Sequence, residues 1–204
     1  MITIKKISGI LFVIIFLGYP PFVYFGTVHL SPRIVSLIVI VGLIFRLFTS
    51  SANRSSKIVL PATAVGITLC TVSALLDNEL YMQYLPVIYS LLFFLVFGST
   101  LIRPPSMIEV FARSFAPSLS PEEVSYCKKV TFIWVIFFVI NGLITVITIY
   151  LDAFKLWAYY NGFVSYVLMF MIFTSEFLYR HWKFRRYVGL STDRYLKKIF
   201  PPVQ

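Results

Sequence analysis

Few side chains in this sequence can do chemistry, and four of them lie in or beside long apolar stretches. Glu176 is the only acidic residue well inside an apolar segment, and Asn141 and Asn161 add uncharged amides. Polar groups at membrane depth are functional candidates, because lipid offers them no hydrogen-bond partners. Glu109 opens a shorter amphipathic stretch. Asn141, Asn161, Glu176 and Glu109 are therefore the candidates for contact with a ligand or substrate.

Each of the three residues in the apolar segments also has a purely structural interpretation. Glu176 stands four residues before Arg180, so the two can form an ion pair along one helix face. Asn141 and Asn161, each followed by a glycine, can hydrogen-bond between helices. The sequence leaves both interpretations open.

Four basic residues form a second candidate group, which we call the basic rim: Arg103, Arg113, Lys128 and Lys129. Such a rim can hold anionic lipid headgroups or an acidic protein partner such as an acyl carrier protein. Topology alone explains the same charges equally well.

Several catalytic classes are disfavoured. The eight acidic residues include no D-x-x-D or D-x-x-x-D cluster that could hold a divalent metal. His29 and His181 are predicted on opposite sides of a membrane, and the G-x-S-x-G, GxxxxGK[ST] and GxGxxG motifs are absent. The sequence therefore predicts no catalytic set, no metal site and no cofactor. Cys70 and Cys127 are predicted at different depths, as small buried side chains.

The composition is that of an integral membrane protein. Hydrophobic residues make up 59% of the 204 residues and charged residues 13%, and the mean hydropathy is +0.86. The net charge of +10 arises from basic residues that flank apolar segments, which argues against nucleic acid as a partner. We expect one membrane domain covering residues 1–204.

The most informative stretch runs from Ser120 to Arg186. Ser120 and Glu123 form a capping box that starts a helix. Two apolar segments, 130–151 and 156–179, are joined by a very short polar interval, and each is long enough to cross a bilayer. They must form an antiparallel hairpin whose basic ends share one side of the membrane.

Hydropathy predicts an all-α bundle of six transmembrane helices. All but two of the 18 Lys and Arg residues, Arg33 and Lys155, fall on one side of this scheme, which the positive-inside rule identifies as the cytoplasm. Both termini are therefore predicted inside, with an uncleaved first span and a basic cytoplasmic tail, 180–204. The spans are 7–28, 34–48, 58–76, 81–101, 130–151 and 156–179.

The loop between the fourth and fifth spans contains a predicted short helix, 106–115. Ser106 and Glu109 form its capping box, and Glu109 can pair with Arg113 four residues later. We expect this helix to lie in the membrane interface with its charged edge toward the cytoplasm.

Several segments resemble a family of small, poorly characterised bacterial inner-membrane proteins. The resemblance is carried by Tyr126 to Thr131 with Asn141-Gly142, by Trp157 to Gly162, by Glu176-Phe177 and by Arg103 to Glu109. Members are often encoded beside genes for dedicated fatty-acid or aryl-polyene synthesis, including those for acyl carrier proteins and acyltransferases. The resemblance implies a role in making, anchoring or moving a lipid, and no defined activity.

Three hypotheses follow. The first is a non-enzymatic membrane component of a lipid or aryl-polyene pathway, which docks acyl-carrier or acyltransferase partners on its cytoplasmic face. The second is a small transporter or flippase, favoured by a Y-x-P pattern that Tyr19-Pro20-Pro21 and Tyr84-Leu85-Pro86 share and that an inverted repeat would explain. The third is an interfacial acyl-modifying enzyme with Glu109 or Glu176 as its base.

Overall fold

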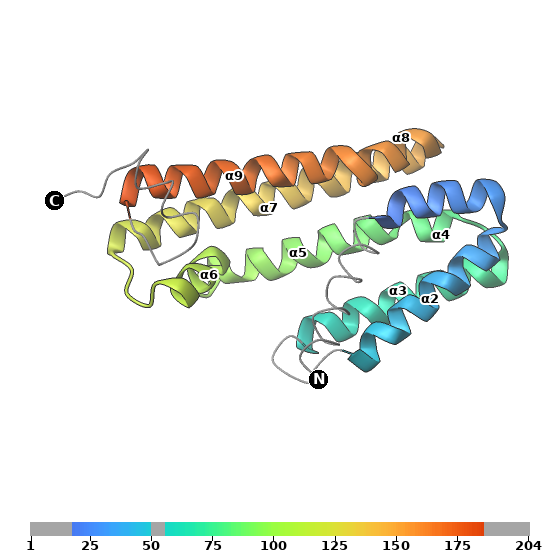
Figure 1. Ribbon diagram of the computed structural model, residues 1–204, viewed down its shortest axis with the longest axis horizontal. Helices are drawn as coiled ribbons and strands as arrows, with labels where there is room; N and C mark the ends of the chain where they lie inside the picture. Colours follow the sequence, from blue (N-terminus) through green and yellow to red (C-terminus); the bar gives the residue numbers. More distant parts are fainter. Residues whose placement is uncertain (1–17, 50–55, 186–204) are drawn as a thin grey trace. The chain divides into compact units, whose positions relative to one another are not determined.

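The computed structural model describes residues 18–49 and 56–185, and every regular element in these ranges is a helix (Figure 1). Residues 7–17 of the predicted first span and the tail beyond residue 185 lie outside the described ranges. The elements are a helix over residues 18–29, α2 (Pro32–Thr49), α3 (Ser56–Leu76), α4 (Leu80–Gln83), α5 (Leu85–Ile102), α6 (Met107–Phe115), α7 (Pro121–Tyr150), α8 (Phe154–Tyr159), the π-helical turn η1 (Tyr160–Val164) and α9 (Ser165–Phe184).

Three helical stretches among the described residues are long and apolar enough to cross a membrane: Leu80–Ile102, Pro121–Tyr150 and Phe154–Phe184. They cover the predicted fourth, fifth and sixth spans. Many of their large apolar side chains are exposed, for example Phe170 and Phe173, as expected of surfaces that face lipid. The described residues are therefore all-helical, as predicted, and three of their helical stretches have the length and composition expected of a membrane protein.

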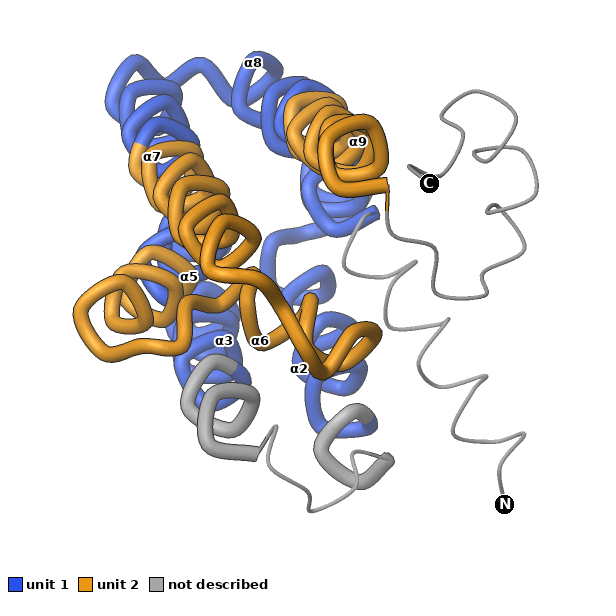
Figure 2. The backbone as a smooth tube through the Cα atoms, turned by 90° about the vertical axis from the view of Figure 1, so that its left-hand side faces the viewer, with its two compact units in different colours: residues 1–92, 140–165 blue, residues 93–139, 166–204 orange. Residues whose placement is uncertain are grey.

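The chain forms two compact units, drawn in different colours in Figure 2. Unit 1 comprises residues 1–92 and 140–165, and unit 2 comprises residues 93–139 and 166–204. The long helices α5, α7 and α9 contribute to both units or begin at their boundary.

In unit 1, α2 and α3 pack as an antiparallel pair. Where α2 begins and α3 ends, the backbone N–H of Arg33 donates to the Asp77 carboxylate at 3.0 Å, and Arg33 Nε donates to the Ala74 carbonyl at 3.1 Å. Asp77 itself adopts a positive φ of 50°, which ends α3 as a left-handed cap. Arg33, one of the two basic residues predicted outside, thus links the start of α2 to the end of α3.

The core of unit 1 centres on Trp157, which is fully buried. Its indole N–H donates to the Gln83 carbonyl at 3.1 Å, next to the break between α4 and α5. Pro86 lacks a backbone N–H and so favours that break. The hydroxyl of Tyr19 donates to the neighbouring Met82 carbonyl at 2.7 Å. These long-range bonds connect three separate parts of the chain.

In unit 2, α6 packs on α5 and α7 through its first turn. The backbone N–H of Met107 donates to Thr100 at 3.0 Å and that of Ile108 donates to Thr131 at 3.2 Å. These bonds satisfy backbone N–H groups of the first turn of α6, which have no hydrogen-bond partner within the helix. The ring of Phe93 on α5 also stacks on that of Phe138 on α7, with centroids 5.2 Å apart.

The short helix α6 is present as predicted, and of its two charged residues only Arg113 is exposed. Glu109 is buried and its carboxylate is occupied by Arg113 and by the helix start, so it does not form an exposed charged edge. The exposed side chains of α6 include the large apolar residues Val110, Phe111 and Phe115.

Candidate functional site

The predicted polar residues of unit 1 lie in one hydrogen-bonded string. Asn141 Nδ2 donates to Ser90 Oγ on α5 at 3.0 Å. The Thr145 hydroxyl lies within hydrogen-bond distance of both the Asn141 carbonyl, at 2.8 Å, and Asn161 Oδ1, at 2.9 Å. The structure therefore brings Asn141 and Asn161 into the same network through Thr145, on facing parts of α7 and η1.

Asn161 also has a local role in the π-helical turn. The Ser165 backbone N–H donates to the Tyr160 carbonyl, five residues back, which widens the turn. The Asn161 side-chain amide donates to the Trp157 carbonyl at 3.0 Å, and the Asn161 side chain is nearly fully buried. The amide thus donates to a backbone carbonyl of the preceding turn, and the bond from Thr145 to Asn161 Oδ1 joins the π-helical turn to α7.

Glu176 lies in unit 2 and is paired with Arg180, as the i,i+4 spacing allows. Arg180 Nε donates to Glu176 Oε1 at 2.7 Å, and Nη2 of the same guanidinium reaches the same oxygen. The guanidinium also lies 5.7 Å from the Tyr126 ring centroid and 3.8 Å from Cys127 Sγ. The pair therefore stabilises the contact of α9 with the start of α7.

Glu109 is likewise held by its own helix. Arg113 Nη2 and Nε contact Glu109 Oε1 at 2.7 and 2.9 Å, and the Ser106 backbone N–H donates to Oε2 at 3.4 Å. The predicted pairing of Glu109 with Arg113 is confirmed. Among the described residues no hydrogen bond or ion pair joins Glu109 to Glu176, since each carboxylate pairs with the arginine four residues further along its own helix.

Three residues of the basic rim are exposed and unpaired within the described part of the chain: Arg103, Lys128 and Lys129. Arg113 is half-exposed, but its charge is compensated by Glu109. Within residues 18–49 and 56–185 no group of three or more His, Cys, Asp or Glu side chains could hold a metal ion.

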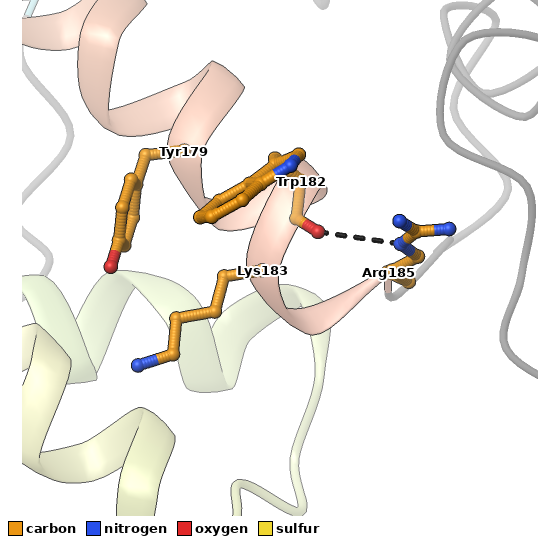
Figure 3. A pocket seen from close by; sticks show the side chains of 4 residues that line it. All are labelled: Tyr179, Trp182, Lys183 and Arg185. Atoms are coloured by element: carbon orange, nitrogen blue, oxygen red, sulfur yellow. Dashed lines mark hydrogen bonds between the residues drawn. The ribbon is translucent and has the colours of Figure 1, made fainter.

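An open depression of about 590 Å³ lies at the end of α9. Tyr179, Trp182, Lys183 and Arg185 line it (Figure 3). Lys183 Nζ pairs with the Glu122 carboxylate at 2.7 Å, and Arg185 Nε donates to the Trp182 carbonyl at 3.4 Å. Aromatic and basic residues of this kind are typical of the water-facing end of a membrane helix.

The sequence prediction missed Ser90, Thr145 and Tyr160. Thr145 could have been found, since Asn141, Thr145 and Thr148 recur at helical spacing and share one face of α7. Ser90 could not, because its contact with Asn141 joins positions 51 residues apart. Nothing in the sequence distinguishes Tyr160 from the other tyrosines, of which the chain has thirteen in all.

Comparison of the chain with known protein families, with characterised proteins and with solved structures finds no match.

Proposed function

We propose that the protein is a six-span component of the bacterial inner membrane with both termini in the cytoplasm. Support comes from the three long apolar helices and from the one-sided distribution of basic residues. In unit 2, Lys183 near the end of α9 contacts Glu122 near the start of α7 at 2.7 Å, as an antiparallel hairpin requires. The basic ends of these two helices then share the cytoplasmic side, and α6 lies in the adjoining interface.

Its function is to dock an acidic acyl-carrier or acyltransferase partner of a lipid or aryl-polyene-type biosynthesis or export pathway, without carrying out chemistry itself. The observation that carries this proposal is the exposed, unpaired charge of Arg103, Lys128 and Lys129. The pathway comes from the sequence resemblance alone.

The arrangement of charge in unit 2 favours a docking surface. Glu109 and Glu176 are neutralised by arginines on their own helices, whereas the three other rim residues keep a net positive charge. Their field attracts an acidic partner and speeds its encounter.

Charge reversal tests the proposal. With the protein in phosphatidylcholine nanodiscs and an acyl carrier protein as the soluble probe, Lys129→Glu is expected to weaken binding about tenfold. Lys128→Glu/Lys129→Glu is expected to abolish it. Biolayer interferometry at low and high salt measures the affinity, which falls with salt for the wild type.

Lys155→Glu is the matched control, because Lys155 is also exposed and is predicted on the opposite side of the membrane. It should leave the affinity unchanged. Equal losses in Lys129→Glu and Lys155→Glu, or no binding by the wild-type protein, would contradict docking through the rim.

A further inference from the structure

Two buried polar atoms in unit 1 have no hydrogen-bond partner within the described part of the chain: Asn141 Oδ1 and the Tyr160 hydroxyl. Tyr160 is only 7% exposed. Buried polar groups in proteins are nearly always paired, and leaving one unpaired in a low-dielectric interior is costly. Each of these atoms therefore needs a physical explanation.

The two atoms belong to adjacent turns of the same hairpin. The Thr145 to Asn161 contact, 2.9 Å, sets the register of α7 against η1. Tyr160 directly precedes Asn161, and Asn141 lies four residues before Thr145, about one helical turn or 6 Å along the axis. Both unpaired groups are thus placed at neighbouring depths.

The chemistry of the two groups narrows the class of ligand. Asn141 Oδ1 is an amide oxygen and can only accept a hydrogen bond, while Nδ2 of the same side chain donates to Ser90. The hydroxyl of Tyr160 can donate or accept. The named polar side chains of the string, from Ser90 to Ser165, are all uncharged, so a carboxylate or phosphate placed here would have no counter-charge. The fitting group is a neutral hydroxyl.

The surroundings indicate where that hydroxyl comes from. Residues beside the two polar ones point outward and are apolar: Ile140 and Leu143 on α7, and Phe163 on η1, are 48%, 57% and 57% exposed. Apolar surface therefore flanks the two polar residues along α7 and η1, which suits a molecule with a polar end and a long apolar chain. The π-helical turn between them is of the type that recurs at functional sites.

We propose that Asn141 and Tyr160 bind the neutral, hydroxyl-bearing end of a long-chain lipid. Asn141 Oδ1 accepts the hydrogen bond from the lipid hydroxyl, and the Tyr160 hydroxyl donates to its oxygen. This site goes beyond the docking function and does not depend on it, since it lies in unit 1 and is tested without a carrier protein.

The test uses nanodiscs of dioleoylphosphatidylcholine, a lipid without a hydroxyl, and oleyl alcohol as the probe. Thermal unfolding is followed with a thiol-reactive dye in a Cys127→Ser background, so that exposure of the buried Cys70 reports on unit 1. Saturating oleyl alcohol is expected to raise the Tm by about 5 °C. Oleyl methyl ether, which has the same chain and cannot donate, should leave the Tm unchanged.

Tyr160→Phe and Asn141→Leu should abolish the rise. Without the probe, Tyr160→Phe should match or exceed the parent in Tm, because it removes an unpaired hydroxyl. Tyr159→Phe is the matched control and should keep the full response, since that ring is 60% exposed. The proposal is overturned if alcohol and ether act equally or if Tyr160→Phe retains the rise. A lower Tm of Tyr160→Phe without the probe also overturns it, because the hydroxyl would then be satisfied by the protein or by water alone.

Discussion

Replacing Trp157 with alanine is expected to lower the free energy of unfolding of unit 1 by about 3–5 kcal/mol. Trp157 is fully buried, its ring lies 5.5 Å from that of Phe154, and its indole N–H holds the Gln83 carbonyl. Alanine leaves a cavity and an unpaired carbonyl at the break between α4 and α5. Lipid does not fill a cavity inside the unit, so the lost packing is not recovered.

The two cysteines give a direct readout of this loss. Cys70 and Cys127 are fully buried, one in each unit, so a thiol-reactive dye detects them only after unfolding. In a Cys127→Ser background, Trp157→Ala should lower the Tm reported by Cys70 by about 10 °C. Trp182→Ala is the control, because Trp182 is 53% exposed, and should change the Tm little. Similar Tm values for the two tryptophan variants would contradict the assigned core.

Gly162→Ala is expected to destabilise unit 1 by about 1–3 kcal/mol. A Cβ at this position would lie 2.7 Å from Cδ of Pro21, a distance that real Cβ atoms essentially never show. The proline ring is stiff and has no rotamer through which to retreat. The helix over residues 18–29 and the turn η1 must therefore move apart, which loosens the packing around Asn161.

Gly42→Ala provides a control of opposite sign. Gly42 lies in α2 of the same unit, and a Cβ there would meet nothing within 4 Å. Since alanine favours the helix by about 1 kcal/mol over glycine, Gly42→Ala should raise the Tm reported by Cys70. If Gly162→Ala also raises it, the close approach of Pro21 to Gly162 is absent from the protein.

Features set by neighbouring residues could be predicted from the sequence. The capping box at the start of α7 is confirmed, with Ser120 N–H to Glu123 Oε2 at 2.7 Å and Glu123 N–H to Ser120 Oγ at 3.3 Å. The two i,i+4 ion pairs are confirmed for the same reason, since helix geometry alone brings the partners together. The burial of both cysteines also agrees with their apolar surroundings.

Features that depend on contacts between distant parts of the chain could not be predicted from the sequence. The bond from Asn141 to Ser90 depends on how α5 and α7 face each other, which no local pattern specifies. The burial of Glu109 could not be predicted either, because it follows from the bonds that the backbone donors of α6 make to Thr100 and Thr131. The π-helical turn at 160–164 coincides with two contacts that the sequence does not reveal, the bond from Asn161 Nδ2 to the Trp157 carbonyl and the close approach of Pro21 to Gly162.

The proposed docking requires that the basic rim face the cytoplasm, where an acidic carrier protein can reach it. Single cysteines placed on the two predicted sides test this directly, in a Cys70→Ser/Cys127→Ser background. Ser114→Cys on α6 and Lys155→Cys at the start of α8 are suitable because both positions are exposed.

The measurement is labelling of these variants by a membrane-impermeant thiol reagent in intact bacterial cells that express the protein. We predict that Lys155→Cys reacts in intact cells and that Ser114→Cys reacts only after the inner membrane is permeabilised. Reaction of Ser114→Cys in intact cells would place the rim outside the cytoplasm and contradict the docking function.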